Sequence, residues 1–191
     1  MTSGAWNERS LAAWVPVEVG DRVTVAGSHP PLMDALERAG ADVRRCHRAV
    51  ELAAGAQGAI HHLVVPDLSD VPDILRREVV SHAVRPGGTV LVGTAHRRPR
   101  RTGHTVRSLR AALADCGVGR IDVFAVRQGL SNPRAIVPVG DRILRWYVTT
   151  SFLPLSRRES VLASGLQLLR VGRVTLPLFP ALMARGEAGD L

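Results

Sequence analysis

Short apolar runs alternate with amphipathic stretches along most of this chain. The runs rich in apolar and β-branched residues are typical of buried strands, and we expect strands at residues 22–26, 41–46, 61–65, 89–92, 121–126 and 135–139. Apolar residues that recur every three or four positions predict helices at residues 32–39, 72–84 and 105–116. The repetition of strand and helix indicates an α/β protein with a mostly parallel sheet.

The stretch Arg85-Pro86-Gly87-Gly88 lies between the predicted helix 72–84 and the strand 89–92. Proline has no N–H and glycine costs helix entropy, so a helix cannot continue through it. We expect a tight turn there, with Ser69 or Asp70 capping the preceding helix. The strands 121–126 and 135–139 are joined by too few residues for a crossover helix, which predicts an antiparallel hairpin that closes the sheet.

The two ends of the chain differ from this pattern. Residues 1–18 contain Trp6 and Trp14, and we expect them to cap the core; the alternative is an arm that orders on a partner. Residues 1–140 are predicted to form the α/β domain, and residues 141–191 an apolar, helical C-terminal extension. The extension packs on the domain, forms an oligomer contact, or docks on a protein partner or a membrane surface.

Composition narrows the functional classes. Apolar residues make up 46% of the chain, and two cysteines imply no disulfide framework, so we expect a globular cytoplasmic protein. All 25 basic residues are arginine, and the net charge of +8 favours an anionic partner or simply reflects GC-rich coding. The absence of lysine excludes Schiff-base chemistry and a P-loop lysine.

Taken together, residues 17–139 resemble the class I S-adenosylmethionine-dependent methyltransferase family. Gly20-Asp21-Arg22-Val23, Gly27 and Leu36–Val43 resemble that family's first strand, loop, helix and second strand. His62–Val65 is similar to its fourth strand, Arg85–Val92 to its Pro-Gly-Gly entry to strand five, and the predicted hairpin to strands six and seven. The resemblance implies a Rossmann-like three-layer sandwich and S-adenosylmethionine as the cofactor.

The resemblance also implies where the cofactor would bind, and the sequence departs from the family there. Candidate cofactor-binding residues are Gly27, Ser28 and His47. His29 and Pro31 stand where the family has further glycines, and Pro30 and Pro31 remove two amide donors. The carboxylate that the family places after strand two falls at Cys46 or His47, and its third strand is shortened or missing between residues 48 and 60.

Two histidines and one aspartate could carry acid/base chemistry. His29 and Asp67 follow predicted parallel strands, whose carboxyl ends meet at one edge of a sheet, so they could approach each other there. His96 follows the next strand at the same edge. The alternative is that His29 caps a helix and Asp67 satisfies a turn. Cys46, His47, His61 and His62 lack the paired spacing of zinc ligands, so we expect no metal site.

Three functions therefore stay open. The first is a degenerate methyltransferase-like protein without a cofactor, which acts as a non-catalytic or accessory partner of a biosynthetic enzyme. The second is an S-adenosylmethionine-dependent methyltransferase with an atypical pocket for a small molecule or peptide. The third is binding of phosphate, nucleic acid or an acidic partner by Arg97, Arg98, Arg100 and Arg101, although no aromatic residues interleave that cluster for base stacking, which disfavours nucleic acid.

Overall fold

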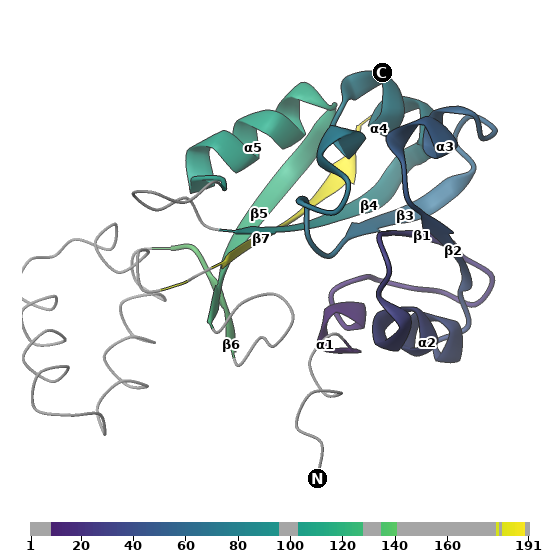
Figure 1. Cartoon of the computed structure of the whole chain (residues 1–191), viewed down its shortest axis with the longest axis horizontal. Coiled ribbons are helices and arrows are strands. Elements are labelled where there is room, and N and C mark those ends of the chain that lie inside the picture. Colours follow the sequence, from purple (N-terminus) through teal and green to yellow (C-terminus); the bar gives the residue numbers. More distant parts are fainter. Residues whose placement is uncertain (1–8, 96–102, 128–134, 141–178, 180, 190–191) are drawn as a thin grey trace, which may run out of the picture.

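The computed structural model describes residues 9–95, 103–127, 135–140, 179 and 181–189 (Figure 1). In this part of the chain the strands form a seven-stranded sheet with the order β2-β1-β3-β4-β7-β5-β6. Their bounds are β1 Arg22–Ala26, β2 Asp42–Cys46, β3 Ile60–Val65, β4 Val84–Ala95, β5 Val118–Arg127, β6 Ala135–Pro138 and β7 Ala181–Ala188. β2, β1, β3 and β4 pair in parallel, β7 is antiparallel to both β4 and β5, and β6 is antiparallel to β5.

Helices cover both faces of the sheet, which confirms the predicted three-layer α/β sandwich (Figure 1). α3 (Ala49–Ala53), α4 (Arg77–Ala83) and α5 (Val106–Asp115) lie on one face, and α1 (Arg9–Ala12) and α2 (Pro30–Arg38) lie on the other. The predicted apolar stripes point inward, because Leu32 and Leu36 of α2 and Leu109 and Leu113 of α5 are fully buried. Each such leucine contributes about 1.5–3 kcal/mol of burial free energy.

The N-terminal segment caps the α2 face of the sheet, as predicted, over the part that is described. Leu11 and Val15 are buried in the same apolar cluster as Leu32 and Leu36. The Trp14 ring packs edge-on against Phe124 of β5, with ring centroids 4.6 Å apart. Residues 1–8, with Trp6, lie outside the described residues.

The predicted helix 72–84 is wrong as a continuous element. A short 3-10 helix, η1, covers Pro72–Ile74, the backbone is non-helical at Leu75 and Arg76, and α4 begins at Arg77. Six positions apart, Ile74 and Val80 would point about 120° away from each other on one α-helix, whereas the break lets both be fully buried. Ser69 and Asp70 cap neither helix, since the residues at the cap positions are Val71 and Arg76.

The Pro-Gly-Gly stretch is a bulge inside β4 instead of a turn that precedes it. Ile60 of β3 pairs with Val84, but His62, two residues on, pairs with Thr89, so the intervening β4 residues bulge out of the ladder. Gly87 has a φ of +73°, which favours glycine. A Cβ on Gly88 would lie 2.5 Å from the carbonyl oxygen of His61, so only glycine fits this close approach.

The C-terminal part of the sheet corrects the predicted domain boundary. The hairpin is confirmed, because β5 and β6 are antiparallel neighbours. However, the strand that lies between β4 and β5 comes from residues 181–188, which we had predicted to belong to a helical extension. These residues pair with β4 on one side and with β5 on the other, with an irregularity in the β5 ladder between Gly119 and Asp122. Residues 141–178 lie outside the described residues.

The predicted shortening of the third strand and its helix is visible in the structure. Between the end of β2 at Cys46 and the start of β3 at Ile60, the chain forms the five-residue helix α3 and no strand. β2 is therefore an edge strand of the sheet, and its exposed Arg44 and Arg45 are typical of edge strands that avoid pairing with other chains. Among the described residues, no helix has the length and apolar character needed to cross a bilayer.

Candidate functional site

The candidate cofactor residues meet at the carboxyl edge of β1 and β2. The Gly27 N–H donates to the carbonyl oxygen of Cys46 at 2.8 Å, which brings the loop after β1 next to His47. Gly27 has a φ of +85°, a conformation that glycine adopts at no steric cost. The Ser28 hydroxyl accepts a long hydrogen bond, 3.5 Å, from the Arg45 guanidinium. The chain thus places Gly27 and Ser28 next to the end of β2, where His47 follows Cys46, and a role of the three residues in cofactor binding stays a prediction.

His29 and Asp70 pack directly on Gly27. The His29 Nε2 and Asp70 Oδ2 atoms are 3.1 Å apart, and a Cβ on Gly27 would lie 3.1 Å from the first and 3.0 Å from the second. α2 begins at Pro30, and the two prolines in its first turn leave no amide donors at these positions. A loop that holds the methionine part of S-adenosylmethionine needs open backbone, so these residues do not fit that part of the cofactor.

The predicted approach of His29 to Asp67 takes a different form. His29 meets a carboxylate from the loop after β3, but this carboxylate belongs to Asp70. The Asp67 Oδ1 atom instead accepts from both the backbone N–H and the hydroxyl of Ser69, each at 2.9 Å. Asp67 therefore satisfies a turn, which was the alternative interpretation of the sequence.

Glu51 provides a carboxylate at the end of β2 that the sequence analysis did not identify. It lies in the first turn of α3, and its Oε2 atom accepts from the backbone N–H of His47 at 2.8 Å. This hydrogen bond lowers the pKa of Glu51, so the group is ionised at neutral pH. The sequence did carry a signal for this role. Glu51 follows Arg48, the residue that precedes α3, by three positions, which is the spacing of a capping box.

Cys46 is a poor nucleophile. Its thiol is buried and donates to the carbonyl oxygen of Arg48 at 2.9 Å. Burial raises the pKa of this thiol, which leaves little of the reactive thiolate at neutral pH.

A cavity of about 230 Å³ lies at the carboxyl ends of β3 and β4. Its lining includes Asp67, Ser69, Thr94 and His104. Burial lowers the pKa of His104, so its ring is neutral at pH 7. His96 and the cluster Arg97, Arg98, Arg100 and Arg101, which the sequence places after β4, lie outside the described residues.

His61 and His62 lie at the opposite, amino edge of the parallel strands, where both meet Asp21. The His61 Nδ1 atom is 2.6 Å from Asp21 Oδ1, and the His62 Nε2 atom is 2.9 Å from Asp21 Oδ2. The Arg85 guanidinium is 3.9 Å from the same carboxylate. In the part of the chain that is described, no group of three or more His, Cys, Asp or Glu residues could hold a metal ion.

Comparisons with known proteins identify the fold of this chain through solved structures, not through its sequence. No protein-family model and no curated protein matches the sequence. An S-adenosylmethionine-dependent methyltransferase from Archaeoglobus fulgidus aligns with a TM-score of 0.57 over 94% of this chain and 92% of its own, at 11% identity. Phosphoethanolamine N-methyltransferase 2 from Haemonchus contortus, bound to phosphomonomethylethanolamine and S-adenosylhomocysteine, aligns with a TM-score of 0.56 at 13% identity.

That second alignment covers 97% of this chain but 53% of the Haemonchus protein, so this chain spans about half of its length. A chain from the complex between the Haloferax volcanii Trm112 methyltransferase activator and a putative methyltransferase aligns with a TM-score of 0.50 over 100% of this chain and 92% of its own, at 14% identity. The chain therefore has the Rossmann-like fold of S-adenosylmethionine-dependent methyltransferases, as its resemblance to the family implied.

Proposed function

We propose that this chain is a methyltransferase-fold protein whose cofactor site is closed by its own side chains and that acts as a non-catalytic or accessory partner of a biosynthetic enzyme. The observation that carries the proposal is the His29–Asp70 pair, which packs at 3.0–3.1 Å from the Cβ position of Gly27. In an open cofactor loop this glycine would let the ligand approach the backbone. Here the imidazole of His29 and the carboxylate of Asp70 occupy the space through which the ligand would approach.

The partner role is supported more loosely. The neighbour from Haloferax volcanii was solved as a complex of a methyltransferase with its activator, so this fold does assemble with accessory proteins. We assign the partner contact of this chain to the apolar residues within 141–178, which lie outside the described residues. Light scattering on the full chain tests whether the contact is with a second copy, since a monomer at all concentrations would exclude a homo-oligomer.

Calorimetric titration with S-adenosylmethionine and S-adenosylhomocysteine tests the closed site. We expect no binding heat from the full chain with either ligand up to about 1 mM, a concentration at which even weak specific sites are half filled. A Kd in the micromolar range for either ligand would contradict the proposal. The matched variant is His29→Gly together with Asp70→Ala, which removes both side chains from Gly27; a gain of binding by this variant alone would identify the pair as the obstruction.

A second candidate function is an S-adenosylmethionine-dependent methyltransferase with an atypical pocket, and Glu51 favours it. Its ionised carboxylate lies beside His47 at the end of β2, and a carboxylate can accept hydrogen bonds from the hydroxyls of a ribose. If the full chain binds S-adenosylhomocysteine, Glu51→Gln should weaken that binding about tenfold, because the charged acceptor is lost. An unchanged affinity would show that Glu51 does not contribute to cofactor binding.

A further inference from the structure

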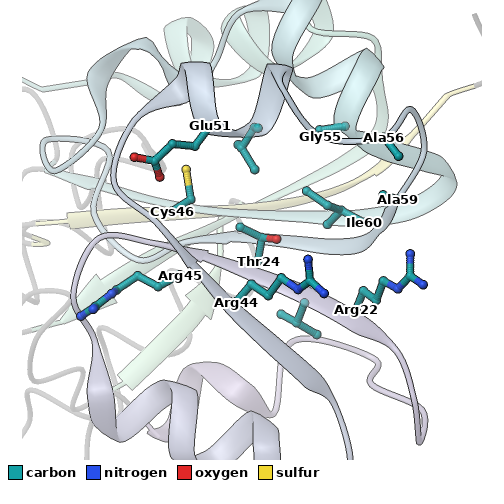
Figure 2. A pocket seen from close by; sticks show the side chains of 13 residues that line it. Arg22, Thr24, Arg44, Arg45, Cys46, Glu51, Gly55, Ala56, Ala59 and Ile60 are labelled. Carbon is teal, nitrogen blue, oxygen red and sulfur yellow. The ribbon is translucent and has the colours of Figure 1, made fainter.

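The missing third strand leaves a cavity of about 260 Å³ on the flank of the sheet, between β1, β2 and the loop that follows α3 (Figure 2). It lies on the face that α3 and α4 cover, and Leu52, Ile60 and Ala83 form its apolar wall. Arg22, Thr24 and Arg44 form the adjoining polar wall, along the strands. The cavity is therefore amphipathic, with a cationic side and an apolar side.

Thr24 is the most buried polar side chain of this cavity. It is 6% exposed, yet its hydroxyl makes no hydrogen bond to any of the residues that the structure describes. The hydroxyl oxygen itself is not sealed off, because it is not among the buried side-chain atoms that lack a partner in the described structure. Figure 2 shows Thr24 pointing into the cavity, so an oxygen or nitrogen atom of a bound molecule can satisfy it there.

Arg22 and Arg44 lie on the same face of the sheet as Thr24. Arg22 pairs with Asp42 and Thr24 pairs with Arg44 in the parallel ladder, and side chains two residues apart on a strand share a face. Figure 2 shows both guanidinium groups extending along one side of the cavity, beside Thr24. Arg45, the residue after Arg44, turns to the other side and reaches Ser28.

These two arginines are poorly neutralised. Among the described residues, the Arg22 guanidinium has no ion-pair partner, and Arg44 has a 3.7 Å contact with Asp42 in which both side chains are more than half exposed. Such exposed pairs are worth little, so both charges remain available to a ligand. Glu51, the carboxylate that lines the cavity, is hydrogen-bonded to His47 beside the thiol of Cys46, away from Arg22.

We propose that this cavity binds the oxyanion group of a small organic anion, a phosphate or a carboxylate. Arg22 and Arg44 donate to the oxyanion, the Thr24 hydroxyl donates to one of its oxygens, and the apolar part of the molecule packs on Leu52 and Ile60. Arginine forms planar, two-pronged hydrogen bonds with both kinds of anion. The proposed donors Arg22, Thr24 and Arg44 are distinct from the residues at the Gly27 edge, although Glu51 lines this cavity as well.

Calorimetry on the full chain with inorganic phosphate, glycerol phosphate and butyrate tests the site. Tighter binding of either phosphate compound than of butyrate identifies a phosphate site, and the reverse order identifies a carboxylate site. Arg22→Gln and Arg44→Gln should each weaken the better probe about tenfold, and Thr24→Val, which keeps the side-chain shape, several-fold. Arg110→Gln, which removes one exposed charge from α5, is the matched control and should leave the affinity unchanged.

Three results would overturn the proposal. One is that no probe binds the full chain at about 10 mM, which is weaker than any useful anion site. The second is that Arg110→Gln weakens binding as much as Arg22→Gln, which would indicate attraction to overall charge. The third is that Arg22→Gln and Arg44→Gln bind normally while glutamine at Arg97, Arg98, Arg100 and Arg101 abolishes binding. Thermal unfolding midpoints equal to that of the unaltered chain verify that Thr24→Val and both arginine variants fold.

Discussion

His62 is 4% exposed and has a polar contact on one side of its ring alone. Its Nε2 atom lies 2.9 Å from Asp21, and its Nδ1 atom is buried without a hydrogen-bond partner in the described structure. We infer that the proton sits on Nε2, where it is donated to the carboxylate. A second proton on Nδ1 would be a buried donor without an acceptor, which fits the effect of burial in lowering the pKa of His62.

Asp21 is the charged member of the cluster. Burial alone would raise its pKa, but hydrogen bonds from the Glu18 backbone N–H and from both histidines outweigh burial and hold the pKa at about 2. Asp21 therefore contributes stability that is complete above its ordinary pKa of 3.8 and is lost as the pH falls towards 2.

The same linkage makes the protein lose stability in mild acid. The unfolded chain protonates His62 near the ordinary pKa of 6.5, whereas the folded chain resists protonation until a lower pH. The stability from a neutral His62 is thus complete above 6.5 and falls as the pH drops below it. Urea unfolding between about pH 8 and about pH 5 should show a decrease in the free energy of unfolding.

His62→Gln keeps a donor for Asp21 but cannot titrate, so it should lose less stability over this pH range. Some dependence should remain, because burial also lowers the pKa of His104. Equal pH dependence in His62→Gln and the unaltered chain would show that His62 does not titrate as inferred.

At the scale of elements, the bulge in β4 shows how a local pattern and its tertiary use can differ. Arg85-Pro86-Gly87-Gly88 predicted an end of helix and a beginning of strand, and both occur within two residues of the stretch. The pattern could not predict which residue packs against Gly88, because the contact that requires this glycine is with His61 on another strand. The same reason explains the break at Leu75, where burial of Ile74 and Val80 overrides a regular helical pattern.

Gly88→Ala should destabilise the protein by about 3 kcal/mol, since its Cβ would lie 2.5 Å from a main-chain oxygen and one strand must shift. Gly87→Ala is the comparison: it has no atom within 4 Å of its Cβ position and suffers the strain of a φ of +73°, about 1–2 kcal/mol. Urea denaturation of both variants measures the difference. A larger effect at Gly87 would contradict this description of the bulge.

The sequence predicted which loops lie at the carboxyl edge of the sheet but not the contacts that their side chains make there. Gly27, Ser28 and His47 could be placed at this edge because they directly follow the apolar runs that form β1 and β2. The sequence predicted Asp67 as the partner of His29, but the partner is Asp70. Loop residues follow no hydrophobic periodicity, so the sequence does not show which of two aspartates three residues apart faces His29. The cavity at Arg22 and Arg44 exists because no further strand lies beside β2. The sequence shows that the strand is shortened or missing, but it does not show whether other side chains fill the space.

At the scale of the whole molecule, the sheet joins residues that are far apart in the sequence. β4 and β5, which end at Ala95 and Arg127, are held together through β7, which begins at Ala181. The sequence Ala181–Ala188 consists of alanine, leucine, methionine, arginine, glycine and glutamate, and it has none of the β-branched or aromatic residues that favour strands. The pairing was therefore missed, although the parallel strands β1 and β3, buried on both faces, were predicted close to their bounds.

A chain that ends at Gly140 should fail to fold cooperatively, because it lacks the strand between β4 and β5. Circular dichroism during heating should show a broad loss of signal in place of a single transition. A chain that ends at Gly189 keeps the whole of β7 and is the control, with a transition like that of the full chain. A sharp transition in the shorter chain would mean that β4 and β5 can pair without β7.

The position of β7 also sets an order of events during synthesis. β4 and β5 leave the ribosome long before Ala181–Ala188 are made. Until then each of the two strands has an unpaired backbone edge, which can pair with strands of other chains. Contacts across such a separation close slowly, and the last strand must enter between two others instead of adding to an outer edge. The nascent chain is therefore most prone to aggregation, and most dependent on chaperones, during the interval in which residues 128–180 are translated.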